Sequence, residues 1–216
     1  MKLSIVGGTG DIGEGMALRL SSMHEVILGS REVEKSCSVS DLCVKTLEER
    51  GISCSCRGVT NQQAIEAADV IVLALPFKHV APTLATLSGF EGKVVISPVN
   101  PIEKPDHFVF APPPEGSAAL LIRKLLPENT KVVAAFNNIA ANRWKAINDP
   151  LEYSVAVCGD DPAAKKLVMS LANGVQNLTA YDVGPLAVSP MVEAVTPLLL
   201  DVAKYSRMRD VGIQFR

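Results

Sequence analysis

Apolar residues along this chain fall into short continuous runs, separated by longer stretches in which apolar and polar residues recur at helical spacing. The runs are 3–6, 69–75, 93–97, 131–136 and 153–158. Such runs are typical of strands buried on both faces, because a half-buried strand would alternate. Helices are expected at 32–50, 61–67, 117–126 and 162–172. This order predicts an α/β fold of the Rossmann type, with a doubly wound, mostly parallel sheet covered on both faces.

The C-terminal part of the chain predicts a small α/β extension of this sheet. A strand is expected at 176–180 and a turn at 182–185, before a helix from about Val188 to Arg207 that Pro197 should kink. Residues 1–216 are therefore expected to form a single domain, with a sub-boundary near 140–150. The lobe beyond it has about half the size of an ordinary domain, too little for an independent one.

The first apolar run leads directly into a glycine-rich turn that opens a helix. Gly8, Gly10 and Gly13 have the spacing G-x-G-x-x-G. Such glycines permit a sharp turn, bring backbone N–H groups close to a pyrophosphate and pack the helix closely on its strand. Since a second strand follows at βαβ spacing, we expect a dinucleotide here, with its phosphates at the positive end of the helix. The alternative is a glycine-rich turn that binds nothing.

The end of the second strand indicates which dinucleotide is bound. An acidic residue there would bond the ribose 2′-hydroxyl of NAD, whereas an arginine accommodates the 2′-phosphate of NADP. Here Ser30 offers a hydroxyl and Arg31 a guanidinium, so NADP is favoured. Lys35 is either a third contact or an ordinary surface lysine.

Composition and charge argue against nucleic-acid, membrane and metal-binding functions. The formal net charge of −2 argues against nucleic acid as a partner. The first strand begins at residue 2 or 3, and no apolar run is judged long enough to span a membrane, so we expect a cytoplasmic protein without a membrane partner. Five cysteines, an odd number, indicate reduced thiols, and three dispersed histidines show no metal-ligand spacing. No metal is expected.

Two segments that follow strands are candidates for the walls of the site. Phe77, in the turn after the run 69–75, is either a contact to the nicotinamide or ribose or a core aromatic. His79 is expected to be a surface histidine at a helix N-terminus. Six prolines between residues 98 and 114 exclude a regular helix or a central strand. We interpret that stretch as a wall or lid on the substrate side.

No side chain is placed as an obvious catalytic acid, base or nucleophile. None of Tyr153, Tyr181 and Tyr205 has a lysine four residues later, which argues against a short-chain alcohol dehydrogenase. Hydride transfer between two planar heteroaromatic rings mainly needs stacking at about 3–3.5 Å and exclusion of water. A second redox cofactor as the substrate fits this lack of catalytic groups.

Several stretches resemble the coenzyme F420-dependent NADP reductases (F420H2:NADP oxidoreductases), and together they cover essentially the whole chain. They are Val6–Asp11, Leu28–Glu32, Val72–Pro76, Ser97–Pro101, Ala134–Ile139, Cys158–Asp161 and Val192–Leu199. The resemblance implies reversible hydride transfer between NADP(H) and the deazaflavin of F420, in a homodimer. Because the residues offer no obvious acid, base or nucleophile, no catalytic side chain is expected.

The resemblance also implies where each cofactor lies. The residues expected at the dinucleotide are Thr9, Gly10, Asp11 and Ile12 for the pyrophosphate, Ser30, Arg31 and Lys35 for the 2′-phosphate, Phe77 and Ala81 for the wall, and Ala141 near the nicotinamide. The residues expected at the deazaflavin are Ser97, Asn100, Pro101, Asn137 and Asn138, with Thr196 closing the pocket. Asn137 and Asn138 replace a His-Thr pair of some members.

Two other functions remain open on the sequence alone. One is an NADPH-dependent reductase of another flavin or of ferric iron, and the other is a non-catalytic NADP-sensing regulatory module. The basic residues Lys204, Arg207 and Arg209 either attract the anionic tail of F420 or lie on a solvated helix face, and we favour the second interpretation.

Overall fold

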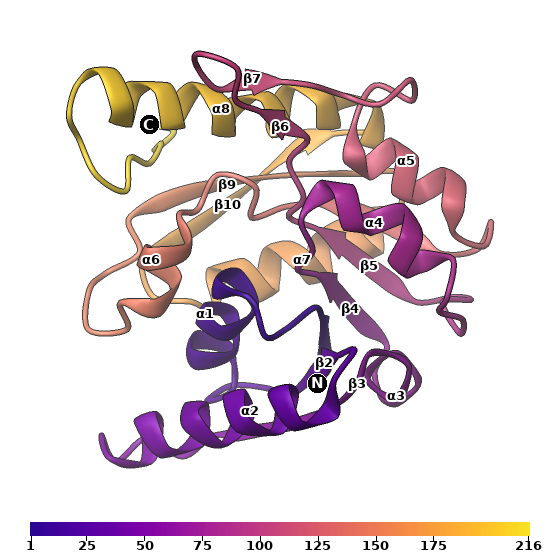
Figure 1. Ribbon diagram of the computed structural model, residues 1–216, viewed down its shortest axis with the longest axis vertical. Coiled ribbons are helices and arrows are strands. Elements are labelled where there is room, and N and C mark those ends of the chain that lie inside the picture. Colours follow the sequence, from indigo (N-terminus) through magenta and orange to yellow (C-terminus); the bar gives the residue numbers. More distant parts are fainter.

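The computed structural model describes residues 1–216 and is built around one eight-stranded sheet (Figure 1). In sheet order the strands are β10 (Leu178–Gly184), β9 (Tyr153–Gly159), β8 (Lys131–Ala134), β5 (Val94–Ser97), β4 (Val70–Leu73), β1 (Lys2–Val6), β2 (Glu25–Ser30) and β3 (Ser55–Thr60). The six strands from β8 to β3 are parallel, whereas β9 pairs antiparallel with β8 and parallel with β10. The predicted Rossmann-type fold with a small C-terminal extension is confirmed.

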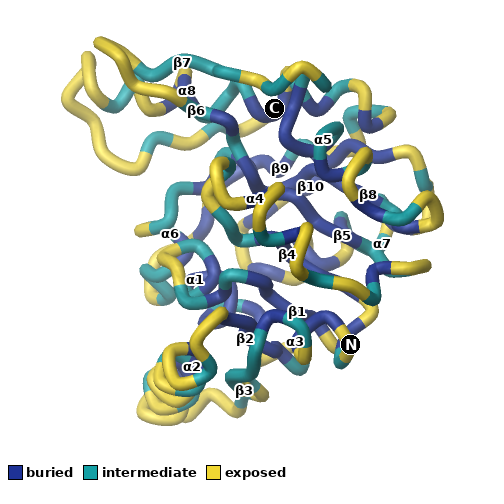
Figure 2. The backbone as a smooth tube through the Cα atoms, turned by 45° about the vertical axis from the view of Figure 1, so that its right-hand side comes forward, coloured by how far each residue is buried: buried dark blue, intermediate teal, exposed yellow.

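Helices cover both faces of the sheet, as a doubly wound fold requires. Their bounds are α1 Asp11–Leu20, α2 Val33–Glu48, α3 Asn61–Ala67, α4 Phe77–Leu84, α5 Ala118–Leu125, α6 Ala141–Lys145, α7 Pro162–Asn173, the 3-10 turn η1 Leu186–Val188 and α8 Ser189–Tyr205. One core holds the buried side chains of α1, α2, α6 and α7, and the other those of α3, α4, α5 and α8. Figure 2 shows the central strands buried and the outer side of α2 exposed.

Each central strand contributes to both cores because its successive side chains point to opposite faces. In β1, Leu3 and Ile5 lie in one core and Val6 in the other. In β4, Val72 and Ile71 are divided in the same way, and all five side chains are at most 3% exposed only because helices cover both sides. The continuous apolar runs in the sequence therefore have the expected origin.

The edge strands differ from the prediction. The strand expected at 52–57 begins at Ser55 and continues to Thr60, and the strand expected at 176–180 runs from Leu178 to Gly184, through the predicted turn. Both lie at the ends of the sheet, where one edge has no neighbour and many side chains are exposed or half-buried. Polar residues such as Asp182 are tolerated there, so no apolar run marks the bounds of an edge strand.

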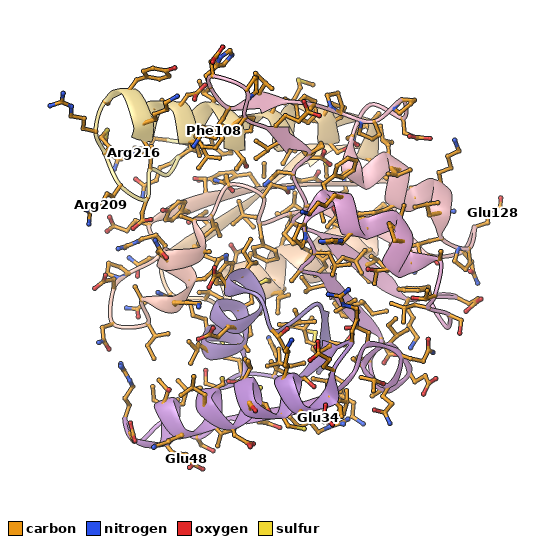
Figure 3. The ribbon with its side chains drawn as sticks, in the orientation of Figure 1. Glu34, Glu48, Phe108, Glu128, Arg209 and Arg216 are labelled. Carbon is orange, nitrogen blue, oxygen red and sulfur yellow. The ribbon has the colours of Figure 1, made fainter.

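The proline-rich stretch holds a small hairpin, which the sequence analysis did not predict. Strands β6 (Ile102–Glu103) and β7 (Val109–Phe110) pair antiparallel, apart from the main sheet. The hairpin lies along α8, where the N–H of Phe108 donates to Asp201 Oδ1 at 2.9 Å (Figures 1 and 3). The exclusion of a helix and of a central strand is confirmed, because this pair is short and peripheral.

One stretch of 20 residues, Leu186–Tyr205, is long and apolar enough to cross a membrane by length and composition, with a mean hydropathy of 1.5 over 18 of its residues. The expectation that no apolar run reaches this length is therefore wrong. A third of these 18 residues is buried within the fold. Its Glu193 carboxylate is fully buried and accepts hydrogen bonds from the N–H groups of Ala118 and Ala119, at 2.8 and 2.9 Å. The helix also continues through Pro197 to Tyr205.

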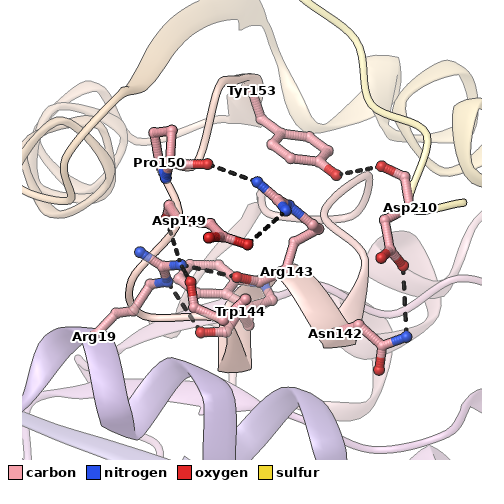
Figure 4. Close-up of polar contacts among 9 residues, drawn as sticks. Arg19, Asn142, Arg143, Trp144, Asp149, Pro150, Tyr153 and Asp210 are labelled. Carbon is pink, nitrogen blue, oxygen red and sulfur yellow. Dashed lines mark hydrogen bonds and ion pairs between the residues drawn. The ribbon is translucent and has the colours of Figure 1, made fainter.

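Helices α1 and α6 approach each other closely at Gly15. A Cβ atom added to Gly15 would lie 2.4 Å from the Cβ of Trp144. Arg19 strengthens the contact, because its guanidinium donates to four backbone carbonyl oxygens of the segment from Arg143 to Asp149 (Figure 4). This lone side chain satisfies the carbonyl groups at the C-terminal end of α6.

We expect the substitution Gly15→Ala to lower the free energy of unfolding by about 1–2 kcal/mol. The overpacking against Trp144 outweighs the higher helix propensity of alanine. Gly174→Ala is the control, since the nearest atoms would lie 3.4 Å from its new Cβ. Urea unfolding of both variants measures the difference, and equal stabilities would contradict the proposed contact.

Candidate functional site

Two adjoining cavities open above the carboxyl ends of β1 and β4, where the order of the sheet reverses. Their volumes are about 380 and 280 Å³, and both are lined by Gly10, Ala74, Leu75 and Pro76. Below, the larger is named the first cavity and the smaller the second cavity. Ligands of open α/β sheets bind at this switch point.

The glycine turn forms the boundary between the cavities. A Cβ at Gly13 would lie 2.6 Å from the Cα of Gly8, so the helix and the turn are in direct backbone contact. Gly7 has a φ of 72°, and its N–H donates to Asn61 Oδ1 at 3.1 Å. The turn is thus held in the shape that the glycine spacing predicted.

The N-terminus of α1 is open toward both cavities. Gly10 caps the helix without any side-chain hydrogen bond. No acceptor in the protein bonds the N–H groups of Thr9, Asp11, Ile12 and Gly13. Free N–H groups together with the helix dipole form an anion-binding site.

The second cavity is polar and brings together the predicted Ser30, Arg31 and Lys35. Arg31 is exposed and has no ion-pair partner in the protein. Lys35 is paired with Glu32 at 2.8 Å, and this hydrogen bond lowers the pKa of the Glu32 carboxyl. The guanidinium is therefore the free cation of this cavity, and Lys35 already has an anionic partner.

Among the residues of the second cavity that the sequence analysis did not predict as site residues are Asn61, His79 and Thr83. His79 and Thr83 lie one turn apart on α4. The sequence analysis placed Phe77 in a turn and His79 at the N-terminus of a helix, but it did not predict the bounds of that helix. The helix contains Pro82 and has only eight residues, so it carries little periodic signal. For Asn61, the Thr60–Gln63 capping box is the signal that marks its position at the start of α3.

The first cavity is mainly apolar. Phe77, Ile12 and Ala141 line it together with Pro98, Val99 and Ile102, while Asn100 and Asp11 add polar groups. Phe77 is half-buried and lines this cavity, and it also packs against the core beneath. Ala81, one helical turn later, is exposed and lines neither cavity.

A hydrogen-bonded cluster borders the first cavity where β5 and β8 end. Asn100 Nδ2 donates to the backbone oxygen of Asn137 at 2.8 Å, and Thr196 Oγ1 donates to the same oxygen at 2.7 Å. Asn137 is 4% exposed, and its Oδ1 has no partner. The preceding residue, Phe136, has a φ of 67°, a strained conformation of the kind found at binding sites.

The other residues expected around this cluster lie differently. Ser97 is fully buried with an unpartnered hydroxyl, and Pro101 is buried as well. Asn138 Nδ2 donates to the backbone oxygen of Ser154 at 2.9 Å, so its amide is directed to β9. Asn138 and Thr196 instead line a separate apolar cavity of about 110 Å³ beneath α8. The residues predicted to contact the deazaflavin therefore lie near one another, but they do not all line the same cavity.

The basic residues at the end of the chain lie apart from the two main cavities. Lys204, Arg207 and Arg209 are exposed at or beyond the C-terminal end of α8, and Lys204 Nζ donates to the backbone oxygen of Asp106. Figure 3 shows Arg209 and Arg216 projecting from this end of the molecule.

Comparisons with known proteins identify the family. The model of the family "NADP oxidoreductase coenzyme F420-dependent" matches residues 2–101. The F420-dependent NADP reductase of Methanocaldococcus jannaschii is 36% identical over 220 residues, which cover 99% of this chain and 97% of that protein. This chain belongs to the F420-dependent NADP reductase family. The resemblance in its sequence motifs is thereby confirmed.

Two further proteins are similar to this chain, one in structure and one in sequence. A solved structure from Arthrobacter sp. FB24 superimposes on this chain with a TM-score of 0.81, and the match covers 100% of this chain and 99% of that one at 22% identity. It shows the shared fold. The rat metalloreductase STEAP3 is 29% identical over 95% of this chain, which corresponds to 38% of that protein.

We expect the stability of this protein to depend on pH through Glu193. Burial raises the pKa of this carboxyl from 4.5 to about 7, although the N–H groups of Ala118 and Ala119 oppose the change. The folded state therefore binds a proton more tightly than the unfolded state. The resulting stabilisation, at most about 3 kcal/mol, is complete below pH 4.5 and is lost as the pH rises to about 7.

Urea unfolding of the wild type and of Glu193→Gln at pH 5 and pH 8 measures this contribution. The wild type should lose more stability than the variant between the two pH values. An identical loss in both proteins would show that Glu193 does not titrate in this range.

Proposed function

We propose that this chain catalyses reversible hydride transfer between NADP(H) and coenzyme F420, an 8-hydroxy-5-deazaflavin. The observation that carries the proposal is the junction of the two cavities at the free N–H groups of α1. A dinucleotide that binds its pyrophosphate there extends its adenosine into the polar cavity and its nicotinamide into the apolar one. The name of the relative from M. jannaschii supports the same reaction.

The dinucleotide site is proposed to use the glycine turn and both cavities. Gly8, Gly10 and Gly13 shape the turn, and the N–H groups of Thr9, Asp11 and Ile12 bind the pyrophosphate. Ser30 and Arg31 bind the 2′-phosphate, with Lys35 beside them. Phe77 and Ala141 border the nicotinamide, because both line the first cavity. Ala81 has no support from the cavity lining and is proposed on the resemblance alone.

The deazaflavin is proposed to lie over the first cavity, against the cluster of Asn100 and Asn137. Ser97 and Pro101 shape the floor from beneath, and Asn138 and Thr196 hold the neighbouring segment and α8 in place. The two rings supply the redox chemistry, and the protein residues bind them, orient them and exclude water. The one titratable side chain that lines the first cavity, Asp11, is paired with Lys145 at 2.7 Å, and no catalytic residue is proposed. No metal is proposed either.

A homodimer is proposed on the pattern of α8. Met191, Val195, Leu198, Val202 and Tyr205 follow one another at alternating spacings of four and three residues, and Met191, Leu198 and Tyr205 are 60–68% exposed. An apolar stripe with this spacing fits a second helix of the same kind. We further propose one domain over residues 1–216 in a reducing, cytoplasmic compartment, supported by the single sheet and by five unpaired thiols. No nucleic-acid or membrane partner is proposed.

A second candidate function is the reduction of ferric iron or of another flavin by NADPH. The identity of 29% with the metalloreductase STEAP3 favours it over the remaining alternative, a module that senses NADP without catalysis. The three candidates differ in the electron acceptor. The first reduces F420, the second reduces ferric iron or free flavin, and the NADP-sensing module reduces no acceptor.

A spectrophotometric assay distinguishes the candidates. We expect the absorbance of oxidised F420 to bleach when the protein and NADPH are added, with little turnover of FMN or Fe(III). The substitution Ala141→Phe should abolish turnover, because the larger side chain fills the first cavity. The variant protein should still bind adenosine 2′,5′-bisphosphate, which lacks a nicotinamide. Ala163→Phe, on an exposed position of α7, is the matched control. Turnover of FMN or iron but not F420 would contradict the proposal.

The Arg31 guanidinium is proposed to bind the 2′-phosphate that distinguishes NADP from NAD. We expect Arg31→Ala to reduce the preference for NADP over NAD by about 10- to 100-fold, because charge-assisted hydrogen bonds contribute about 1.5–3 kcal/mol. Arg57→Ala, on the edge strand β3 and outside both cavities, should leave the preference unchanged. Titration with both reduced dinucleotides measures it, and an unchanged ratio in Arg31→Ala would refute the NADP assignment.

A further inference from the structure

The N-terminus of α1 carries two carboxylates where the dinucleotide phosphates are proposed to bind. Asp11 and Glu14 both lie in the first helical turn. Asp11 is 77% exposed and lines the first cavity. Acidic groups at this end stabilise the helix dipole, but they repel a second anion. A pyrophosphate at the free N–H groups therefore meets an unfavourable field unless a cation offsets it.

Lys145 supplies a cation at this point. Its Nζ lies 2.7 Å from Asp11 Oδ1 and 2.7 Å from Glu14 Oε2. The hydrogen bond to Asp11, followed by that to Glu14, raises the pKa of Lys145, so the side chain remains protonated. The Lys145 side chain is 31% exposed, so its charge is only partly screened by water.

The position of Lys145 is fixed by helix α6, which ends at this residue. Trp144 packs on Gly15, and Arg19 donates to the backbone oxygens of Trp144 and Arg143, both at 2.9 Å (Figure 4). The same helix begins at Ala141, which lines the first cavity. Helix α6 therefore presents a small residue to the nicotinamide side and a cation to the start of α1.

We propose that Lys145 is a positioning residue of the dinucleotide site. By pairing with Asp11 and Glu14 it holds both carboxylates to one side and neutralises part of their charge, so that the N–H groups of α1 can donate hydrogen bonds to a pyrophosphate. The inference rests on the proposed function. It differs from the role of Arg31, because the pyrophosphate is common to NADP and NAD. Lys145 thus sets the affinity for both dinucleotides and not the choice between them.

The test is a titration of Lys145→Gln with NADPH and NADH, followed by nicotinamide fluorescence at low ionic strength. We expect Kd to rise about 5- to 20-fold for both. Displacement by adenosine 2′-monophosphate, which has no pyrophosphate, should give a wild-type affinity. The double variant Asp11→Asn/Lys145→Gln should recover much of the lost affinity, because it removes one of the uncompensated charges. Lys124→Gln breaks a comparable ion pair with Glu115, 2.7 Å long and outside both cavities, and should not change Kd.

Two results would overturn the inference while the wild type binds NADPH. One is a Kd of Lys145→Gln within twofold of the wild type. The other is an equal loss of affinity for adenosine 2′-monophosphate without recovery in the double variant, since this indicates a general loosening of the fold. A wild type that fails to bind NADPH would overturn the proposed function together with this inference.

Discussion

The free backbone N–H groups at the start of α1 are the feature on which the rest of the site depends. They stay free because Gly10 offers no capping side chain, and they point into the cleft because Gly8 and Gly13 allow the turn and the helix to touch. Asn61 fixes the turn from the neighbouring helix α3. An uncapped helix end costs stability in an empty protein, and bound phosphate oxygens satisfy it.

The two cavities on either side of this helix end have opposite character, although they share Gly10 and the segment 74–76. The polar one is built by β2, α2 and α4, all in the N-terminal half. The apolar one adds the loop after β5 and helix α6. Helix α8 closes the structure behind them. Its Glu193 bonds the first turn of α5, its Ser189 hydroxyl lies 2.7 Å from that of Ser117, and its Thr196 bonds Asn137.

Local patterns in the sequence were sufficient to predict the parallel sheet, the glycine turn and the position of Ser30 and Arg31 at the end of β2. These features depend on neighbouring residues and on burial. The same patterns did not predict long-range contacts or short elements. Helices α4 and α6 have eight and five residues and show little periodicity. The pair of Lys145 and Asp11 joins residues 134 positions apart, which no spacing rule reveals. Edge strand bounds were missed because exposed strands tolerate polar residues.

The fold is proposed to bring two planar rings together so that a hydride passes directly between them. Isotopic labelling tests it most directly. NADPH carrying deuterium at the transferred C4 position is oxidised with F420 in H2O, and the reduced deazaflavin is analysed by mass spectrometry and NMR. Direct transfer predicts deuterium at C5 of the product, and no solvent label there when unlabelled NADPH reacts in D2O. Loss of the deuterium to water, or incorporation from D2O, would contradict the account.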